Sequence, residues 1–242
     1  MNLKKEVSKR YNKIAKRYSK QIYENFWNNV LEYPITVAEI KKLNVKNKKV
    51  LDVGCGSGRY TKVLVKSNAK VWGIDISKRM VEIAKRDVKE AQISIGNIYK
   101  TKFKDNFFDV IFSGLAIEYL DREKFFKEAN RILKKNGILL FSMQNPYTER
   151  ADKISKNKYI FRFGNYFKEE NFYQYWPNFK TKMPFKHVTM QTMIRAILKN
   201  NFTIIDYIDI KPPLWSRKKF KRQYKRVIRL APFCIMKLRK VK

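Results

Sequence analysis

The segment Val50-Leu51-Asp52-Val53-Gly54-Cys55-Gly56-Ser57-Gly58-Arg59 combines a short apolar run with three closely spaced glycines. The run from Val50 to Val53 is typical of a buried strand, and the residues from Arg59 onward have helical spacing. Glycine lacks Cβ and tolerates positive φ, so its backbone can approach a ligand closely. The helix that follows offers free N–H groups. The segment therefore predicts a ligand-binding loop at the carboxyl end of a strand, where doubly wound sheets bind their ligands.

Beyond this loop, short apolar runs alternate with helical patterns. Strands that alternate with helices indicate βαβ units with right-handed crossovers and a parallel sheet. We expect strands at residues 50–53, 70–75, 92–95, 108–113 and 137–142, with helices at 59–66, 78–89 and 122–133 between them.

Residues 1–45 are expected to form a helical cap. Leu3 to Tyr23 has apolar residues at steps of three and four, which is typical of an amphipathic helix that packs on the body. Pro34 to Leu43 predicts a second helix, because proline is tolerated in a first helical turn.

Residues 146–188 interrupt the alternation with proline, asparagine, lysine and many aromatic residues. Long insertions in compact domains are usually functional lids or disordered segments, and the aromatic content favours a lid. After it we expect a helix at 190–200, a strand at 202–210, a basic helix around 220–230 and an apolar run at 233–238.

The second expected strand ends in Asp75, seventeen residues after Gly58, where a carboxylate can accept hydrogen bonds from both hydroxyls of a ribose. The glycine spacing is G-x-G-x-G, whereas dinucleotide folds use G-x-G-x-x-G beneath a pyrophosphate. Asp52, just before the loop, would oppose a pyrophosphate but suit a cationic ammonium or sulfonium ligand.

The stretch from Val50 to Asp75 resembles the first two motifs of class I S-adenosylmethionine-dependent methyltransferases, and Asn106 to Met143 resembles the rest of their core. The closest subset is methyltransferase type 11, which includes quinone-biosynthesis enzymes and many small-molecule methyltransferases. The resemblance implies an α/β fold: a Rossmann-like, doubly wound, seven-stranded, mostly parallel sheet whose last strand is antiparallel. It also implies that residues 1–242 form a single domain with S-adenosyl-L-methionine as cofactor.

By this resemblance, the loop from Asp52 to Gly58 cradles the methionine part of the cofactor and Asp75 holds its ribose. Asn97 takes the place of the family's acidic residue, and its amide oxygen can accept the same hydrogen bond. The implied cofactor-binding residues are Asp52, Gly54, Cys55, Gly56, Gly58, Asp75, Ile76, Met80, Asn97, Ile98, Ser113 and Tyr18.

A general base is required only if the acceptor is a hydroxyl or an acidic carbon, because the sulfonium already activates the methyl group. The candidates are Tyr119, His187 and Glu118. Tyr119 stands where the family often has histidine. For His187 a structural or substrate-edge role is favoured over a catalytic one.

The formal net charge is +34, and residues Lys211–Lys242 contain thirteen Lys/Arg and no Asp/Glu. This basic segment could bind RNA, rest on an anionic membrane surface or simply be solvated. No run is apolar enough for a transmembrane segment and no signal sequence is evident, so a cytoplasmic location is expected. Cys55, Cys234 and the lone His187 predict neither a disulfide nor a metal site.

The expected function is methyl transfer by in-line displacement to a small-molecule acceptor, with a tRNA or rRNA methyltransferase as the alternative. A non-catalytic RNA-binding protein and a nicotinamide oxidoreductase are weaker alternatives, the latter disfavoured by the glycine spacing. The acceptor atom and the oligomeric state stay open.

Overall fold

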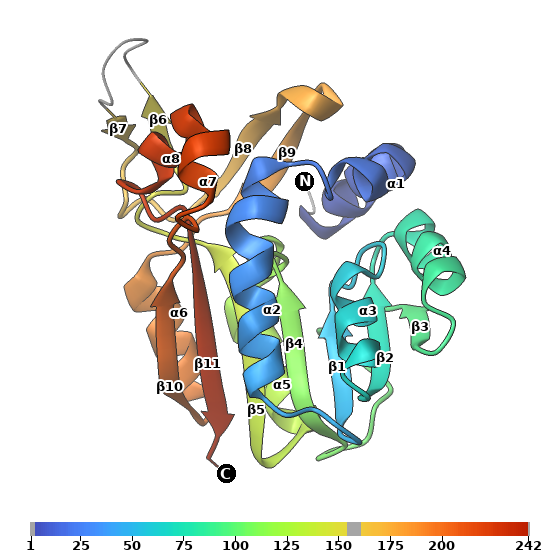
Figure 1. The fold of residues 1–242 in the computed structure, drawn as a ribbon. Helices are drawn as coiled ribbons and strands as arrows, with labels where there is room; N and C mark the ends of the chain where they lie inside the picture. Colours follow the sequence, from blue (N-terminus) through green and yellow to red (C-terminus); the bar gives the residue numbers. More distant parts are fainter. Residues whose placement is uncertain (1–2, 154–160, 242) are drawn as a thin grey trace.

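A seven-stranded sheet forms the centre of the molecule (Figure 1). The computed structural model describes residues 3–153 and 161–241. The strand order is β10-β11-β5-β4-β1-β2-β3, and β11 alone runs against the other strands of this sheet. The predicted Rossmann-like fold is therefore confirmed. The strands are β1 (Lys49–Val53), β2 (Lys70–Asp75), β3 (Gln92–Ile95), β4 (Phe108–Gly114), β5 (Leu133–Gln144), β10 (Phe202–Asp209) and β11 (Phe233–Lys240).

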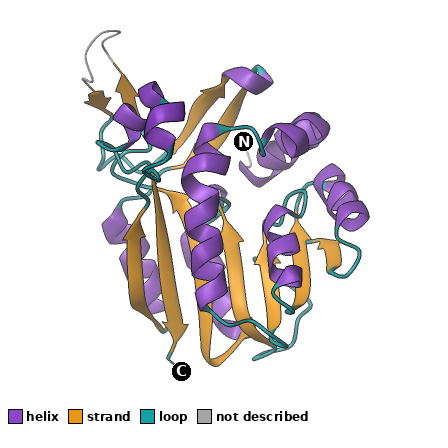
Figure 2. Ribbon diagram, viewed as in Figure 1, coloured by secondary structure: helices purple, strands orange, loops and turns teal. Residues whose placement is uncertain are grey.

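Helices cover both faces of the sheet, with α2 and α3 on one face and α5 and α6 on the other (Figure 2). The helix α1 lies beyond the carboxyl ends of the strands and contacts α4. The helices are α1 (Leu3–Gln21), the π-helix η1 (Phe26–Glu32), α2 (Tyr33–Lys42), α3 (Arg59–Lys66), α4 (Lys78–Asp87), the 3-10 turn η2 (Ile117–Tyr119), α5 (Arg122–Ile132), the 3-10 turn η3 (Pro177–Phe179), α6 (Met190–Lys199), α7 (Ser216–Lys219) and α8 (Lys221–Val227).

Two hydrophobic clusters fill the space on either side of the sheet. Successive side chains of a strand point to opposite faces, so Val50 joins the cluster under α2 and α3 while Leu51 joins the cluster under α5 and α6. Phe112 and Ile111 of β4 divide in the same way. Because both faces are buried, the central strands read in the sequence as continuous apolar runs.

The insertion at residues 146–188 contains two antiparallel strand pairs that the sequence did not reveal. One pair is β6 (Ala151–Lys153) with β7 (Phe161–Phe163), and the other is β8 (Asn171–Trp176) with β9 (Thr181–Lys186). Both lie at the end of the molecule where the parallel strands finish (Figure 1). Residues 154–160 of the insertion lie outside the described residues, as do residues 1–2 and 242 of the terminal segments.

The basic helix expected around residues 220–230 is observed as α8, and a second short helix, α7, precedes it. The backbone of Phe220 has φ −125° and ψ 46°, which separates α7 from α8. The ring of Phe220 packs 5.2 Å from that of Phe26, so the break turns an apolar side chain toward the body. None of the helices in the described residues is both long and apolar enough to cross a membrane.

Within β5, Asn136 and not Gly137 has the left-handed backbone. Gly137 is required there for another reason: a Cβ at this position would lie 2.7 Å from Leu133 Cγ and 2.8 Å from the Lys134 carbonyl oxygen. Nearby, Lys240 at the end of β11 donates from Nζ to Asn106 Oδ1 at 2.8 Å and to the carbonyl oxygen of Asn130 at 2.7 Å.

Candidate cofactor site

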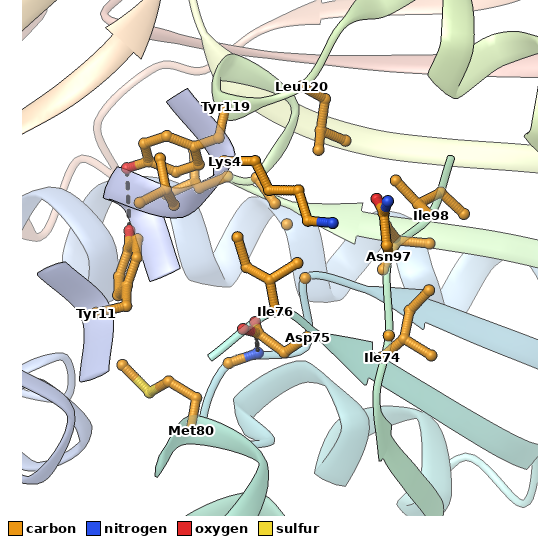
Figure 3. A pocket seen from close by; sticks show the side chains of 18 of the residues that line it. Lys4, Tyr11, Ile74, Asp75, Ile76, Met80, Asn97, Ile98, Tyr119 and Leu120 are labelled. Carbon is orange, nitrogen blue, oxygen red and sulfur yellow. Dashed lines mark hydrogen bonds between the residues drawn. The ribbon is translucent and has the colours of Figure 1, made fainter. Parts of the chain in front are cut away.

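A cavity of about 110 Å³ lies between α1 and the carboxyl ends of β1, β2 and β4 (Figure 3). Strand ends, the glycine loop and one helix therefore build it together. Its walls are Lys4, Val7, Tyr11 and Tyr18 from α1; Val53, Gly54 and Gly56 from the glycine loop; Ile74, Asp75, Ile76 and Met80 from β2 and α4; Gly96, Asn97, Ile98 and Tyr99 after β3; and Gly114, Leu115, Ala116, Tyr119 and Leu120 after β4.

Two glycines of the loop have different surroundings. Gly56 has φ +52°, and a Cβ built on it meets nothing within 4 Å, so this backbone faces the cavity openly. Gly58 has φ +88°, and a Cβ there would lie 2.9 Å from Val88 Cγ2. Gly56 thus leaves room for a ligand, whereas Gly58 lets the loop pack against the end of α4.

The carboxylate of Asp75 is held by two backbone amides. Gly56 N donates to Oδ2 at 2.9 Å and Ser77 N donates to Oδ1 at 2.8 Å. Burial raises the pKa of Asp75, while these two donors oppose the rise. Each carboxylate oxygen keeps a further lone pair, so Asp75 can still accept hydrogen bonds from a ligand in the cavity.

Polar contacts tie α1 across the cavity. Asn12 Oδ1 accepts from Ser77 Oγ at 2.9 Å and from Arg79 N at 3.0 Å, both at the start of α4. Ser8 Oγ donates to the carbonyl oxygen of Ile76 at 2.9 Å. The helix is therefore positioned by the same strand end that carries Asp75.

A group of rings, which we call the aromatic wall, packs beside η2, and three of them, Tyr11, Tyr18 and Tyr119, line the cavity. Its members come from α1, η2 and the β8–β9 hairpin. The hydroxyl groups of Tyr11 and Tyr119 lie 3.0 Å apart, Tyr18 stacks on Trp176 at 6.1 Å between ring centroids, and Tyr119 stacks on Phe185 at 5.0 Å. The aromatic wall consists of Tyr11, Tyr18, Tyr119, Phe172, Trp176, Phe179 and Phe185.

Comparison with known proteins agrees with this geometry. Residues 51–141 match the family model described as "Methyltransferase domain". An S-adenosylmethionine-dependent methyltransferase from Mesorhizobium loti has a similar structure, with a TM-score of 0.73 at 20% sequence identity; the match covers 86% of this chain and 97% of that one. Residues 51–141 thus match a methyltransferase domain, and the fold around them is the one found in S-adenosylmethionine-dependent methyltransferases.

Two curated relatives match the chain over shorter stretches. The ubiquinone biosynthesis O-methyltransferase of Pelagibacter ubique is 37% identical over 42% of this chain and 44% of its own length. The demethylmenaquinone methyltransferase of Thermotoga maritima is 26% identical over 61% of this chain and 66% of its own length. In each of these two matches the chain spans less than two thirds of the relative.

The cofactor is S-adenosylmethionine, and the residues of the cavity suit it. The open backbone at Gly56 and the available lone pairs of Asp75 fit the methionine and ribose parts. Ile76 and Ile98 offer apolar surface for a flat ring, with the Asn97 amide beside them (Figure 3). The ligand contacts of these residues stay predictions, as do those of Gly54, Met80 and Tyr18, which also line the cavity.

Asp52 does not line the cavity, so its carboxylate does not present itself to a cationic ligand as the sequence suggested. It is 1% exposed and accepts a hydrogen bond from Thr61 Oγ1 at 2.6 Å. Burial raises the pKa of Asp52 to about 7. In this position the side chain fastens the strand that precedes the glycine loop to α3.

Three other residues of the predicted cofactor set also lie outside the cavity walls. Cys55 packs in a small cluster with residues of α4 and β3. Ser113 donates from Oγ to the carbonyl oxygen of Val53 at 3.0 Å, which joins β4 to β1. Cys55, Ser113 and Gly58 therefore pack behind the residues that line the cavity.

Glu118 is a buried acid next to the aromatic wall but is not one of the cavity walls. Burial raises the pKa of Glu118 to about 8, and Arg122 opposes the rise. Its Oε2 has no hydrogen-bond partner among the described residues. A carboxyl group in this environment is protonated at neutral pH and cannot accept a proton until the pH approaches 8.

His187 lies away from the cavity, at the end of β9, with both ring nitrogens engaged. Nδ1 contacts the carboxylate of Glu149, and Nε2 donates to the carbonyl oxygen of Tyr166 at 2.7 Å. Although burial opposes it, hydrogen bonding to Glu149 raises the pKa of His187, so the pair shares a proton inside the insertion. This environment supports the structural interpretation of His187 over the catalytic one.

Several cavity residues were absent from the sequence-based prediction. Lys4 extends from α1 toward Asn97 (Figure 3), and Val7 lies one turn further along the helix. Their signal was the apolar stripe of α1, which predicts a buried face but not what that face covers. Leu115 and Ala116 belong to the loop from Ser113 to Leu120, which the family resemblance places beneath the sulfonium, but neither was named as a site residue.

Proposed function

We propose that this methyltransferase transfers the methyl group of S-adenosylmethionine to an oxygen or carbon atom of a small, flat, largely apolar acceptor, such as the hydroxylated ring of a quinone precursor. The aromatic wall is the observation that carries this proposal. Its rings Tyr11, Tyr18 and Tyr119 line the cavity, and the rings of the β8–β9 hairpin pack against them. Aromatic side chains bind flat apolar molecules through offset stacking and edge contacts.

The bound cofactor supplies a methyl group already activated by a sulfonium. The protein then has to hold the acceptor atom in line with that methyl group and keep water out. The aromatic wall and α1 are placed to do both. Burial raises the pKa values of Tyr11 and Tyr119 well above the usual value for tyrosine. Both hydroxyl groups are therefore neutral at physiological pH and act as hydrogen-bond donors and acceptors, not as bases.

The composition of the cavity favours an acceptor that ionises readily. Among its described wall residues, Asp75 supplies the only carboxylate and there is no histidine. Two backbone amides already hold Asp75 at the predicted ribose end. A phenol, or a carbon flanked by carbonyl groups, can lose its proton to solvent with little help, whereas an alcohol would require a dedicated base.

The names of two relatives support this acceptor class: one acts in ubiquinone biosynthesis as an O-methyltransferase and the other on demethylmenaquinone. Both names refer to quinones, and the first specifies methylation of oxygen. The RNA methyltransferase alternative gains no support from the comparisons.

Methyl-labelled S-adenosylmethionine tests the proposal directly. The full chain is incubated in parallel with a catechol-containing quinone precursor, a demethylated quinol, a malonyl thioester and total tRNA. We expect label in the organic extract of at least one ring acceptor, with the product position assigned by mass spectrometry. Label only in tRNA or only in the thioester would overturn the proposal.

A further inference from the structure

The segment around α7 and α8 carries a surface in which exposed apolar side chains lie among basic ones. Leu214, Trp215 and Ile228 are 80%, 59% and 49% exposed. Residues 211–230 contain nine Lys/Arg and no Asp/Glu. Single exposed apolar residues are ordinary, but aliphatic and indole side chains concentrated within fifteen basic-rich residues indicate an interaction surface.

The inner side of this segment is firmly packed. Phe220 contacts Phe26 at 5.2 Å between ring centroids, and Val227 is 1% exposed within the core cluster beneath α2. The guanidinium of Arg226 lies 5.3 Å from the ring centroid of Trp27. The backbone is therefore anchored by one set of side chains, and the exposure of Leu214, Trp215 and Ile228 is a property of the fold, not of a frayed end.

The docking surface, as we call it, consists of Leu214, Trp215, Lys218, Lys221, Arg222, Lys225 and Ile228. Its four basic side chains are exposed and have no ion pair to any residue that the structure describes. Helices α7 and α8 stand at the edge of the sheet where the parallel strands end, as does the cofactor cavity (Figure 1). A partner bound there would approach the molecule from the side on which the cavity lies.

We propose that the docking surface binds the headgroup layer of an anionic lipid bilayer. Lysine and arginine side chains near a bilayer are attracted to anionic lipids, and tryptophan prefers the boundary between headgroups and acyl chains. Leu214 and Ile228 favour lipid over nucleic acid, because they have no ring to stack on a base, whereas a few apolar side chains inserted at the boundary strengthen peripheral binding. The proposal concerns where the protein binds and does not depend on which acceptor it methylates.

Co-sedimentation of the full chain with vesicles tests the proposal. One vesicle set contains phosphatidylcholine with about a third phosphatidylglycerol, and the other contains phosphatidylcholine alone. Two variants test the two parts of the surface separately. The apolar variant carries Leu214→Ser, Trp215→Ser and Ile228→Ser. The charge variant carries Lys218→Gln, Lys221→Gln, Arg222→Gln and Lys225→Gln.

The matched control replaces four exposed lysines at the opposite edge of the sheet, Lys46, Lys102, Lys104 and Lys135, by glutamine. It has the same net charge as the charge variant. The affinity of each variant for S-adenosylmethionine serves as the folding control.

We expect the parent to bind the anionic vesicles, to lose that binding as salt rises, and to bind phosphatidylcholine alone weakly. Each docking-surface variant should lose binding at least about tenfold, and the opposite-edge control should stay within about twofold of the parent. If the opposite-edge control and the charge variant lose vesicle binding equally, net charge alone explains the binding and the proposal is overturned. The proposal also fails if the apolar variant binds vesicles like the parent, or if the surface binds an RNA oligonucleotide but no vesicles.

Discussion

The hydroxyl groups of Tyr11 and Tyr119 lie 3.0 Å apart, although 108 residues separate them in the chain. Tyr11 belongs to α1 and Tyr119 to the turn that follows β4, so the contact forms only when the helix lies over the cavity. One of the two hydroxyls must donate to the other, which leaves a single proton to offer to a ligand. The pair therefore forms only when α1 closes the cavity, and it then offers one hydrogen-bond donor to a ligand at the aromatic wall.

Tyr119→Phe should reduce the methylation rate about three- to tenfold, the effect of removing one hydrogen bond of ordinary strength. The affinity for S-adenosylmethionine should change less than twofold, because the ring and its stacking on Phe185 remain. Steady-state kinetics and calorimetric titration check the two quantities. Tyr18→Phe also removes a phenolic hydroxyl from the cavity wall, but one outside the Tyr11–Tyr119 pair, and is the matched control. An unchanged rate in Tyr119→Phe would remove this hydroxyl from the reaction.

Asp75→Ala should weaken S-adenosylmethionine binding by about 1.5 to 3 kcal/mol, the effect of losing hydrogen bonds to a charged acceptor. Part of the loss should come from the glycine loop, since the carboxylate also holds Gly56 N. Calorimetric titration measures the change. Asn97→Ala removes a neutral amide from the same cavity and should weaken binding by only about 0.5 to 1.5 kcal/mol. If Asp75→Ala binds the cofactor like the parent, Asp75 does not hold the ribose.

Gly56→Ala and Gly58→Ala should separate binding from stability. Both positions have positive φ, so either alanine strains the backbone by about 1 to 2 kcal/mol. Only the Gly58 variant adds a clash, with Val88 at 2.9 Å, whereas the new methyl group at Gly56, which lines the cavity, meets no atom within 4 Å. Urea unfolding should therefore show the larger loss for Gly58→Ala, and cofactor titration the larger loss for Gly56→Ala. The opposite order would mean that Gly56 serves only as a turn.

Glu118→Gln should change how stability depends on pH. The pKa of Glu118 is raised from 4.5 to about 8 by burial. Below pH 4.5 the group is protonated in both states, but between 4.5 and 8 the unfolded chain loses a proton that the folded protein keeps. The unfolded state then binds fewer protons, so this group makes the free energy of unfolding fall as the pH rises to about 8.

Removing the titrating group should shrink the difference in unfolding free energy between pH 5 and pH 8.5, by on the order of a few kcal/mol. Urea titrations at the two pH values measure it. Other buried acids, including Asp52, keep some of the dependence in the variant. Glu24→Gln, at an exposed position, should leave the parental difference intact. A parental pH dependence in Glu118→Gln would mean that Glu118 titrates normally.

The strands of the central sheet could be predicted closely because burial on both faces makes each of them a short, continuous apolar run in the sequence. The predicted strands at 70–75 and 92–95 have the observed bounds. The β8–β9 hairpin could not be predicted, since Tyr173 and Tyr175 on its exposed side are aromatic, like Phe172 and Trp176 on the other. Alternation between apolar and polar residues, which normally marks a strand, is therefore absent.

In the candidate site, too, some residues could be predicted from the sequence and others could not. Residues set by local backbone geometry, such as Gly56 and Asp75, could be placed from the sequence because loop and strand end are adjacent in every fold of this type. Asp52 could not, because which way a strand-end carboxylate turns depends on its partner Thr61. Lys4 reaches the cavity only because α1 packs against the sheet, and the spacing of the apolar residues in α1 does not indicate where the helix packs.

The position of β11 has a consequence for synthesis of the chain. This strand pairs with β5 on one side and β10 on the other, so residues 233–240 fill the gap between two segments made earlier. Until they leave the ribosome, the backbone edge of β5 has no partner there, and an unpaired strand edge invites pairing with other chains. The nascent protein therefore depends on β11 to seal the sheet, and the contacts of Lys240 with Asn106 and Asn130 form only once this strand is in place.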